Sequence, residues 1–577
     1  MNNVLRGAIA AAEEEGERLR EEFYRPDGPR GRRGSAPVDT EMEERLCAKL
    51  QALVPCAFLG EETGFTPANG AGQEAWLWLV DPHDGTSEFL QGRRGSAVSV
   101  ALLKNRVPVL GVVCSPLSPD RGHDTIAWAE GIPKLLRNGQ GVNDSTGNFL
   151  WATASSAFRP ETYSRAADHA RYVAMPSIAY RMARVAAGDG AAAITIHDVS
   201  EYDVAAGMAL LRGAGRVALD RTGREIALTG EPGATVNACF GGEREAALRF
   251  SKFDWGRLEG EPRRAPRVNL GFPRRQDEGR LARAAGCLLG QVIGDSLGSR
   301  VEFMNAAEIA REHPGGVREL ADGGRYKTIA GQPTDDSEMA LTLCRSILHE
   351  KKYLKENVLQ AYRVWLQTRP VDVGSTTERG LLGMHTTESE SNGSLMRVSP
   401  LGVWAAGEPA RAAATARTDS ALTHPNPACV EACAGYVAAI AAGIGGADRK
   451  AMLDAALSEA KGTAREAIRR GADGVLPDFA KVGAVLVSLQ NAFQKLLHAK
   501  DFEDALVATV AAGGDTDTNA AIAGALLGAC HGREAIPARW ILPVLACRPL
   551  AEGGALRLRP VDYWPDDLLE LAEALLP

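Results

Sequence analysis

The chain has 577 residues, of which 45% are hydrophobic and 24% charged, and its formal net charge is −8. This length exceeds one ordinary hydrophobic core, so we expect two domains, and the composition excludes a largely disordered protein. The negative charge argues against general binding to nucleic acids or anionic membranes, because both depend on a positive field.

The first part of the chain is predicted to mix helices and strands. Helical patterns fill residues 4–53, and Val-rich strands dominate residues 75–113, with Asn105-Arg106 as a hairpin turn between two of them. An Ala-rich helix and a further strand in "GDGAAAITI" follow. This pattern is typical of an α/β or α+β domain, which we place at residues 1–242.

The second part of the chain has a different pattern. Residues 243–277 are rich in Pro, Arg and Glu without a sustained period, which predicts a linker. From residue 278 to residue 577 nearly every segment is rich in Ala and Leu at helical spacing. We therefore expect an all-α domain there.

The cysteines and the termini bear on the compartment. The ten cysteines lie mostly in apolar stretches, and no second Cys/His pair near Cys429 and Cys433 completes a zinc site. Acids interrupt the N-terminal stretch where a signal peptide needs an apolar region, and we see no apolar span of membrane length. These features predict a cytoplasmic protein without membrane contact.

Two acids, Asp81 and Asp84, follow the apolar run "WLWLV" in "DPHDGT". The run has no polar face and so predicts a strand covered on both sides, with the acids at its carboxyl end. Gly85 and Thr86 then resemble a helix start with free N–H groups. The acids could simply cap this helix, but two oxygen ligands facing a helix start would also suit a hard cation that holds a phosphate.

The motifs "PVDTEMEERL", "GEETG", "WLVDPHDGTSEF", "GVVCSP" and "YDVAAGMALLRGAG" resemble the inositol monophosphatase family over residues 4–240. The resemblance implies a layered sugar-phosphatase fold that hydrolyses a phosphate monoester of a sugar, inositol or nucleotide. It also implies two or three bound Mg²⁺ ions, with Mn²⁺ as an alternative. The implied metal ligands are Glu61, Asp81, Asp84, Asp203 and the backbone carbonyl of His83.

The same resemblance assigns further roles in the first domain. Thr86 and Glu61 would orient the attacking water, and the N–H groups of Gly85 and Thr86 would hold the phosphate. Pro176-Ser177 stands where the family usually has Gly-Ser, and Tyr202 replaces its common Trp. A non-catalytic binding or oligomerisation module is therefore the alternative for this half.

A second pair of acid clusters lies in "GQPTDDSEMAL" and "GGDTDTNAAIAGALLGA", each before an apolar helix. Helix capping would explain either one alone. Together, with glycines that allow tight turns, they indicate a binuclear site for hard metal ions. The residues concerned are Thr334, Asp335, Asp336, Asp515, Asp517 and Thr518.

These motifs, with "GCLLGQVIGDSLGSRVEF", "SNGSLMRVSPLG" and "LTHPNP", resemble the ADP-ribosylglycohydrolase family over residues 280–550. The resemblance implies an orthogonal helix bundle in which those six residues bind two Mg²⁺ ions, with Asp335, Asp336 and a mobile Glu302 acting in catalysis. It assigns substrate binding to Asn392, Gly393, Ser394, Met396 and Arg397. His424 is better explained as a structural residue.

We accordingly expect a bifunctional, metal-dependent hydrolase. The second domain would remove ADP-ribosyl groups from a protein or small molecule by cleaving an N- or O-glycosidic bond. The first would act on a phosphorylated sugar or nucleotide. The sequence is compatible with an oligomer but does not predict one.

Overall fold

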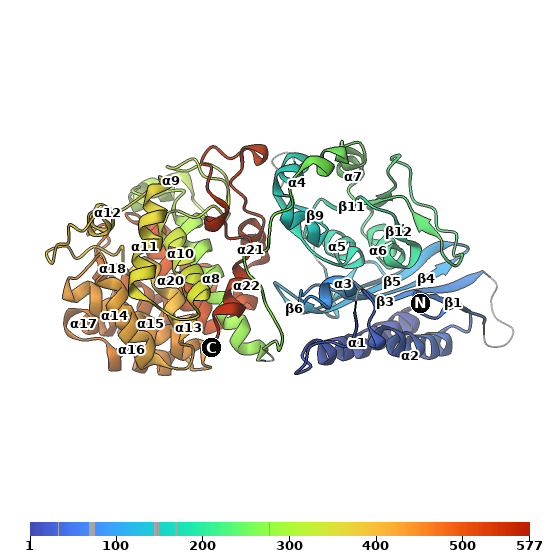
Figure 1. The fold of residues 1–577 in the computed structure, drawn as a ribbon, viewed down its shortest axis with the longest axis horizontal. Helices are drawn as coiled ribbons and strands as arrows, with labels where there is room; N and C mark the ends of the chain where they lie inside the picture. The colour runs from blue at the N-terminus through green and yellow to red at the C-terminus, as the bar shows by residue number, and fades with distance from the viewer. Residues whose placement is uncertain (33, 69–74, 143–146, 148, 168–170, 276) are drawn as a thin grey trace. The chain divides into compact units, whose positions relative to one another are not determined.

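The structure is a computed structural model, shown in Figure 1. It describes residues 1–32, 34–68, 75–142, 147, 149–167, 171–275 and 277–577. The chain divides into two compact units, Met1–Pro266 with Leu270–Gln276 and Arg267–Asn269 with Asp277–Pro577. The first unit mixes helices and strands and the second is helical, which confirms the predicted fold class.

The first unit is built on two large sheets. The larger has eight strands in the order β2-β1-β3-β4-β5-β6-β7-β8, with β1 and β3 parallel and the other neighbours antiparallel. Its strands are β1 (Ala57–Gly60), β2 (Gly64–Thr66), β3 (Trp76–Asp84), β4 (Ala97–Lys104), β5 (Val107–Ser118), β6 (Gly122–Ala129), β7 (Leu136–Arg137) and β8 (Gln140–Gly141). Asn105 and Arg106 both have positive φ between β4 and β5, so the predicted hairpin turn is confirmed.

The smaller sheet has five strands in the order β10-β9-β11-β15-β13. Its strands are β9 (Phe149–Ala152), β10 (Arg171–Ala174), β11 (Ala192–Thr195), β13 (Val217–Leu219) and β15 (Cys239–Gly242), and β12 (Val199–Ser200) pairs separately with β14 (Thr235–Val236). The buried faces of this sheet exclude water on both sides, because helices cover each of them.

Helices alternate with the sheets of the first unit in layers (Figure 1). Helices α1 and α2 pack on one face of the larger sheet, α5 and α6 lie between the two sheets, and α4 and α7 cover the far face of the smaller sheet. The helices are α1 (Asn2–Phe23), α2 (Pro37–Leu53), α3 (Thr86–Phe89), α4 (Pro160–Ala167), α5 (Ile178–Ala186), α6 (Glu201–Gly213) and α7 (Arg244–Ser251).

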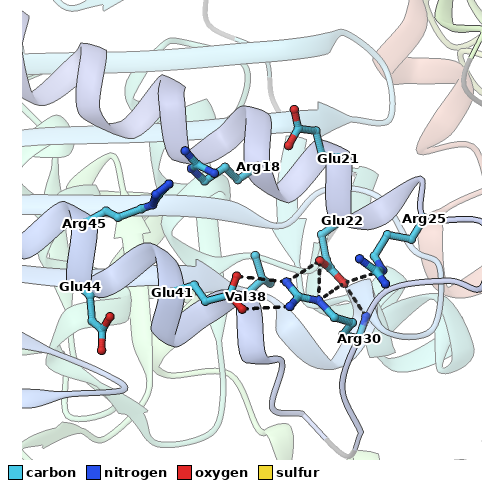
Figure 2. Close-up of a pocket in the computed structure, with 9 residues that line it drawn as sticks. All are labelled: Arg18, Glu21, Glu22, Arg25, Arg30, Val38, Glu41, Glu44 and Arg45. Atoms are coloured by element: carbon cyan, nitrogen blue, oxygen red, sulfur yellow. Dashed lines mark hydrogen bonds and ion pairs between the residues drawn. The ribbon is translucent and has the colours of Figure 1, made fainter.

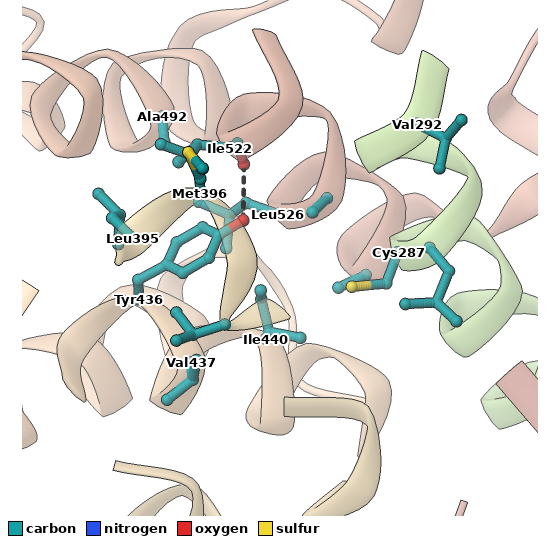
Figure 3. Packing of buried hydrophobic residues seen from close by; sticks show 14 of the residues in the cluster. Cys287, Val292, Leu395, Met396, Tyr436, Val437, Ile440, Ala492, Ile522 and Leu526 are labelled. Carbon is teal, nitrogen blue, oxygen red and sulfur yellow. Dashed lines mark hydrogen bonds between the residues drawn. The ribbon is translucent and has the colours of Figure 1, made fainter. Parts of the chain in front are cut away.

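The second unit has no assigned strand among its described residues. Its longer helices are α8 (Glu278–Gly298), α10 (Asp335–Glu350), α11 (Lys355–Gln367), α14 (Pro409–Ser420), α15 (Pro427–Ile444), α16 (Arg449–Glu459), α17 (Gly462–Ala472), α18 (Val485–His498), α19 (Phe502–Ala511) and α20 (Thr516–His531). Shorter ones are α9 (Ala306–Glu312), α12 (Ser375–Leu381), α13 (Ser399–Trp404), α21 (Ala538–Leu545) and α22 (Leu568–Leu575). Figure 3 shows part of their shared core, where the Tyr436 hydroxyl donates to the Ile522 carbonyl at 2.9 Å.

Helices α8 and α20 run antiparallel with their backbones in contact. Gly290 of α8 faces Gly524 of α20 so closely that an added Cβ would lie 2.2 Å from the Gly524 carbonyl oxygen. Gly286 meets Gly528 in the same way, and Gly294 meets Ala520. This packing brings the C-terminal end of α8 beside the N-terminal end of α20, where acids gather.

The segment predicted as a linker, residues 243–277, contains regular structure in its first part. Helix α7 occupies Arg244–Ser251 and a 3-10 helix occupies Trp255–Gly260, and both pack into the core of the first unit. Phe250 and Trp255 are buried there, so the first unit extends well past residue 242. The mixture of apolar and charged residues in this segment reflects short amphipathic turns.

Within the described part of the chain, one helix, α15 (Pro427–Ile444), is long and apolar enough to cross a membrane, contrary to the expectation from the sequence. Of its 18-residue window, 78% is buried inside the bundle. A central core helix has the same composition, because it contacts apolar neighbours on every side.

Two candidate metal centres

Three acids of the first unit converge from different elements. Glu61 follows β1, Asp81 lies in β3 and Asp203 lies in the first turn of α6. One carboxylate oxygen from each lies within 4.8 Å of those of the other two. The fold therefore does bring these three predicted ligands together.

The carboxylate of Asp84, at the end of β3, contacts the start of α5. Its Oδ2 accepts hydrogen bonds from the Ser177 hydroxyl and, at 2.7 Å, from the Ala179 N–H at the start of α5. Ser177 thus keeps the carboxylate oriented even though Pro176 replaces the usual glycine. Burial is the main cause of the raised pKa values of Asp81 and Asp203, and the nearby charge of Asp84 raises both pKa values further.

His83 is fixed between the acids. Its Nδ1 lies 2.7 Å from Asp39 Oδ1, and its backbone N–H donates to Asp81 at 2.7 Å. The His83 carbonyl, a predicted ligand, accepts a hydrogen bond from the Thr86 hydroxyl at 2.7 Å. Thr86 is therefore placed beside the acids, as its predicted role requires.

The predicted helix start at Gly85 is a single turn. Helix α3 has four residues, and Gly85 adopts φ of 103°, a conformation that favours glycine. An added Cβ would lie 3.2 Å from Ser96 and 3.3 Å from Pro176. Glycine here allows three segments of backbone to approach one another beside the acids.

The acids of the first unit fit bound cations. Burial and mutual repulsion raise the pKa values of Asp81 and Asp203 well above their usual range. Glu61 is exposed as a whole residue, but the protein around its carboxyl group partly desolvates it and raises its pKa to about 7. Divalent cations would remove this repulsion, and a donor set made only of oxygens suits a hard ion such as Mg²⁺. The residues present therefore fit the implied metal.

The second unit holds a similar, more deeply buried cluster. Glu302, Asp515 and Asp517 each bring a carboxylate oxygen within 4.8 Å of the other two. Asp515 and Asp517 lie at the start of α20, and Glu302 follows α8. Thr518 comes next on α20 and hydrogen-bonds to both Asp515 and Asp336.

Helix α10 adds its first turn to this cluster. Asp335 and Asp336 are its first residues, and the hydroxyl of Thr334 donates to Asp336 at 3.1 Å. The same hydroxyl lies 2.9 Å from Asp295, whose carboxylate also accepts the N–H groups of Thr334 and Ser337. No motif singled out Asp295, although "GDSLG" places an acid in a mostly apolar segment of α8.

These acids also fit cations. Burial and neighbouring acids raise the pKa values of Asp335, Asp336 and Asp517 well above their usual range. Two buried oxygens, Asp336 Oδ1 and Glu302 Oε2, have no hydrogen-bond partner among the described residues. Unpartnered buried carboxylate oxygens are costly, and a hard cation would satisfy both.

The residues of the predicted substrate loop differ in whether they reach the acid cluster. Asn392 reaches the cluster, since its Nδ2 donates to Asp515 at 2.7 Å. Gly393 is half-buried, and an added Cβ there would contact Thr377 and His424. Ser394 and Met396 are both buried in the bundle. Figure 3 shows Met396 within the apolar core.

Arg397 differs most from expectation. It is fully buried, and its guanidinium pairs with Asp419 at 3.0 Å and donates to the Asp419 carbonyl and the Thr423 hydroxyl. It also lies 4.6 Å over the Tyr362 ring. The structure therefore places Arg397 as a core ion pair rather than as a donor on a pocket wall.

Two other residues beside the second cluster escaped the sequence analysis. Besides burial, the charge of Asp372 raises the pKa values of Glu302 and Asp335, and Tyr326 hydrogen-bonds to Glu302. Close by, the Gly374 N–H donates to Asp335 at 3.3 Å. The sequence signal for Asp372 was weak, an acid shortly before Gly in "VDVGS".

His424 lies near the same loop. It is buried, its Nδ1 lies 2.8 Å from the Thr423 hydroxyl, and its Nε2 lies 3.0 Å from the Ser391 hydroxyl. Both ring nitrogens thus have partners within the bundle, as expected for a structural residue.

The loop after α1, which carries Arg25 and Arg30, borders a charged pocket of about 460 Å³ between α1 and α2 (Figure 2). Arg30 pairs there with Glu22 and Glu41. The pocket is lined by Arg18, Glu21, Glu22, Arg25, Arg30, Val38, Glu41, Glu44 and Arg45. Because these opposite charges largely pair with one another, the pocket has little net charge to attract an ionic ligand.

Comparison with known proteins agrees with the two centres. Residues 276–576 match the ADP-ribosylglycohydrolase family model, and residues 1–250 match the inositol monophosphatase family model. The chain is 33% identical over 272 residues to the ADP-ribosyl-dinitrogen reductase glycohydrolase of Rhodospirillum rubrum, covering 45% of this chain and 89% of the relative. It is 27% identical over 290 residues to the ADP-ribosylarginine hydrolase Tri1 of Pseudomonas putida, covering 45% and 74%. It is 26% identical over 268 residues to inositol monophosphatase 1 of Solanum lycopersicum, covering 44% and 97%.

Proposed function

Because the chain belongs to the ADP-ribosylglycohydrolase family and also contains an inositol monophosphatase domain, we propose that it is a bifunctional Mg²⁺-dependent hydrolase. Its second unit would cleave the glycosidic bond of an ADP-ribosyl group, and its first would hydrolyse a phosphate monoester. The observation that carries this proposal is the presence of one cluster of acids in each unit, both made only of oxygen donors.

In the second unit, Mg²⁺ would fix the ribose hydroxyls and polarise a water. Glu302, which lies beside Asp515 and Asp517, would orient this water toward the anomeric carbon. The water oxygen adds to that carbon, the glycosidic bond breaks, and the leaving group takes up a proton. Since the relatives named above act on ADP-ribosylated dinitrogen reductase and ADP-ribosylarginine, we propose an ADP-ribosyl-arginine linkage as the first substrate to test.

In the first unit, Mg²⁺ would neutralise the phosphate and lower the pKa of a water. Glu61, whose carboxylate lies near that of Asp81, and Thr86, whose hydroxyl donates to the His83 carbonyl, would orient that water for attack on phosphorus. The water oxygen would bond to phosphorus, the ester bond to the sugar or nucleotide oxygen would break, and that oxygen would take up the proton that the water loses. The alternative of a non-catalytic module receives no support from the acids, because Asp84 is also held in place by Ser177.

The thiols bear on the compartment. All ten cysteines lie in described parts of the chain, none forms a disulfide, and eight of them are buried. A chain that keeps so many thiols reduced suits a reducing cytoplasm, which is the location we propose.

The test uses the purified full-length chain with Mg²⁺ and, separately, with EDTA. Peptides carrying ADP-ribosyl-arginine or ADP-ribosyl-serine are assayed for free ADP-ribose, and inositol monophosphate and a nucleotide bisphosphate for released phosphate. We expect both activities with Mg²⁺ and neither with EDTA. Activity that persists in EDTA would contradict the metal roles, and an inactive first unit with an intact Asp84 would favour the alternative of a non-catalytic module.

Asp84→Asn should lower phosphate release at least about 10²-fold.

A further inference from the structure

The segment Leu270–Arg274, here called the strap, packs on the first unit although the sequence predicted a linker. Residues Leu270–Gln276 belong to that unit. Arg274 is only 6% exposed, and its guanidinium donates to the Gly92 carbonyl. A linker that merely joined two domains would not bury an arginine, because desolvating its charge is unfavourable.

The strap contacts the turn that follows α3. Gly92 has φ of 78°, and an added Cβ there would lie 2.9 Å from the Arg274 guanidinium, 3.2 Å from the Leu270 carbonyl oxygen and 3.3 Å from the Phe272 ring. Gly28, in the loop after α1, meets the same ring, with an added Cβ 3.0 Å from it. The strap therefore contacts both the turn after α3 and the loop after α1.

A continuous row of rings links the strap to the acids. The Phe272 ring lies 6.1 Å from Phe23, and the Arg274 guanidinium lies 5.2 Å over the same Phe23 ring. Phe23 in turn lies 5.3 Å from Phe89 of α3, which lies 4.4 Å from the His83 ring. The His83 ring hydrogen-bonds to Asp39 and its backbone N–H donates to Asp81, so this row of rings ends beside Asp81, a predicted metal ligand.

We propose that the strap positions the phosphatase centre, with Phe272 and Arg274 as positioning residues that hold α3 and His83 against the acids. The proposal rests on the proposed phosphatase activity. Both residues act through the row of rings rather than on the reacting atoms. Their removal would let α3 and the end of β3 move, so that Thr86 and Asp81 would present their oxygens to Mg²⁺ less often in the right arrangement.

The test compares the full-length parent with Arg274→Ala, Arg274→Lys and Phe272→Ala. The matched control is Arg257→Ala. Arg257 lies before the strap, in the 3-10 helix Trp255–Gly260, and 58% of its side chain is exposed. Two quantities are measured: hydrogen–deuterium exchange of peptides spanning residues 76–92, and the Mg²⁺ concentration that gives half-maximal phosphate release.

We expect Arg274→Ala and Phe272→Ala to speed exchange within residues 76–92 and to raise the half-maximal Mg²⁺ concentration about tenfold, as for other lost outer partners of metal ligands. Excess Mg²⁺ should restore most of kcat. Arg274→Lys should recover part of the effect, while Arg257→Ala and all ADP-ribosyl release should match the parent.

Unchanged exchange and unchanged Mg²⁺ dependence would overturn the proposal. So would a uniform rise in exchange that includes the β4–β5 hairpin, because the strap would then only stabilise the unit as a whole. A rise confined to residues 76–92 in a chain that releases no phosphate would support the positioning role and separately refute the proposed phosphatase activity.

Discussion

Asp335 and Asp517 come from different helices, yet burial and the charge of the same third acid, Asp295, raise the pKa of each. Bound cations would offset the repulsion between these carboxylates, so an amide in place of either one would remove a proposed ligand and leave the others unbalanced. The function of each acid therefore depends on its neighbours.

We predict that Asp517→Asn or Asp335→Asn lowers ADP-ribosyl release at least about 10²-fold while phosphate release stays at the parent level. The measurement is initial rates of both products from the same preparation. Asp473→Asn serves as control, because Asp473 is an exposed acid that follows α17. If either active-site variant kept ADP-ribosyl release within about twofold of the parent, the metal assignment would be wrong.

Arg397 leads to a different prediction, about stability. Arg397 and Asp419 are both fully buried, so Arg397→Ala leaves a buried carboxylate without its counter-charge and should lower the free energy of unfolding by about 3–5 kcal/mol. The substrate KM should change little in the fraction that stays folded. Urea unfolding and ADP-ribosyl kinetics measure the two effects.

The control for this pair is Arg397→Met with Asp419→Leu. Removing both charges at once should recover much of the lost stability, since no charge is then left buried alone. A large rise in KM for Arg397→Ala without loss of stability would show instead that the guanidinium reaches the substrate, as the sequence resemblance implied.

At this scale, motifs and their order in the sequence pointed to acids that do lie close together in two groups. It could not show that Arg397 pairs with an acid 22 positions away, nor that Asp295 of α8 would bond to Thr334. Such partners are set by how helices pack, which no local pattern encodes. That the predicted ligands bind metal stays a prediction, which the EDTA and Asp→Asn experiments test.

Among the elements, α8 and α20 depend on glycine at their contact. The backbones approach so closely that Gly290 and Gly524 leave no room for a methyl group. Because Asp295 lies in the last turn of α8 and Asp517 in the first turn of α20, this contact also sets the distance between acids of the second centre.

We predict that Gly290→Ala forces α8 and α20 apart, lowers the stability of the second unit by about 1–3 kcal/mol or more and reduces ADP-ribosyl release. Gly279→Ala, on the first turn of the same helix, is the control. Its added Cβ would lie no closer than 3.4 Å to any atom, and the better helix propensity of alanine should leave stability equal or higher by about 0.5–1 kcal/mol. Equal thermal stability of the two variants would contradict the close contact.

Sequence patterns predicted most elements but not their extent. Asn105-Arg106 forms the hairpin because two left-handed residues match the twist of paired strands. The expected helix at Gly85 is one turn, because it ends at Phe89 and Gly92, with φ of 78°, turns the chain.

For the whole molecule, the change from mixed to helical pattern predicted two units, and the structure has them. The sequence pattern could not predict how the connecting chain is divided between the units. Arg267–Asn269 belong to the second unit, and Leu270–Gln276 belong to the first. Charged, Pro-rich sequence is typical of a linker. Here, however, Arg267 and Arg274 find partners that lie far away in the sequence.

The acids of both centres make the stability of the metal-free chain depend on pH. Burial raises the pKa of Asp295 to about 6, and burial together with neighbouring acids raises those of Glu61 and Glu302 to about 7. In the unfolded chain these groups titrate near pH ~4. The folded state therefore binds more protons between pH ~4 and ~7, so this contribution to stability is present below pH ~4 and is lost as pH rises to about 7.

Mg²⁺ should reverse this trend, because cations and protons compete for the same carboxylates. We predict that the rise in Tm caused by Mg²⁺ over EDTA is larger at pH 8 than at pH 5. Tm with Mg²⁺ is compared with Tm in EDTA at each pH, because acids outside the two centres affect both measurements equally. Asp120 is such an acid: burial would raise its pKa, but the charge of Arg184 lowers it below the usual range. Asp517→Asn should remove the Mg²⁺ response of the second unit and keep that of the first. An equal or larger Mg²⁺ effect at pH 5 would mean that the raised acids do not bind the ion, since protonated carboxyls would otherwise weaken its binding.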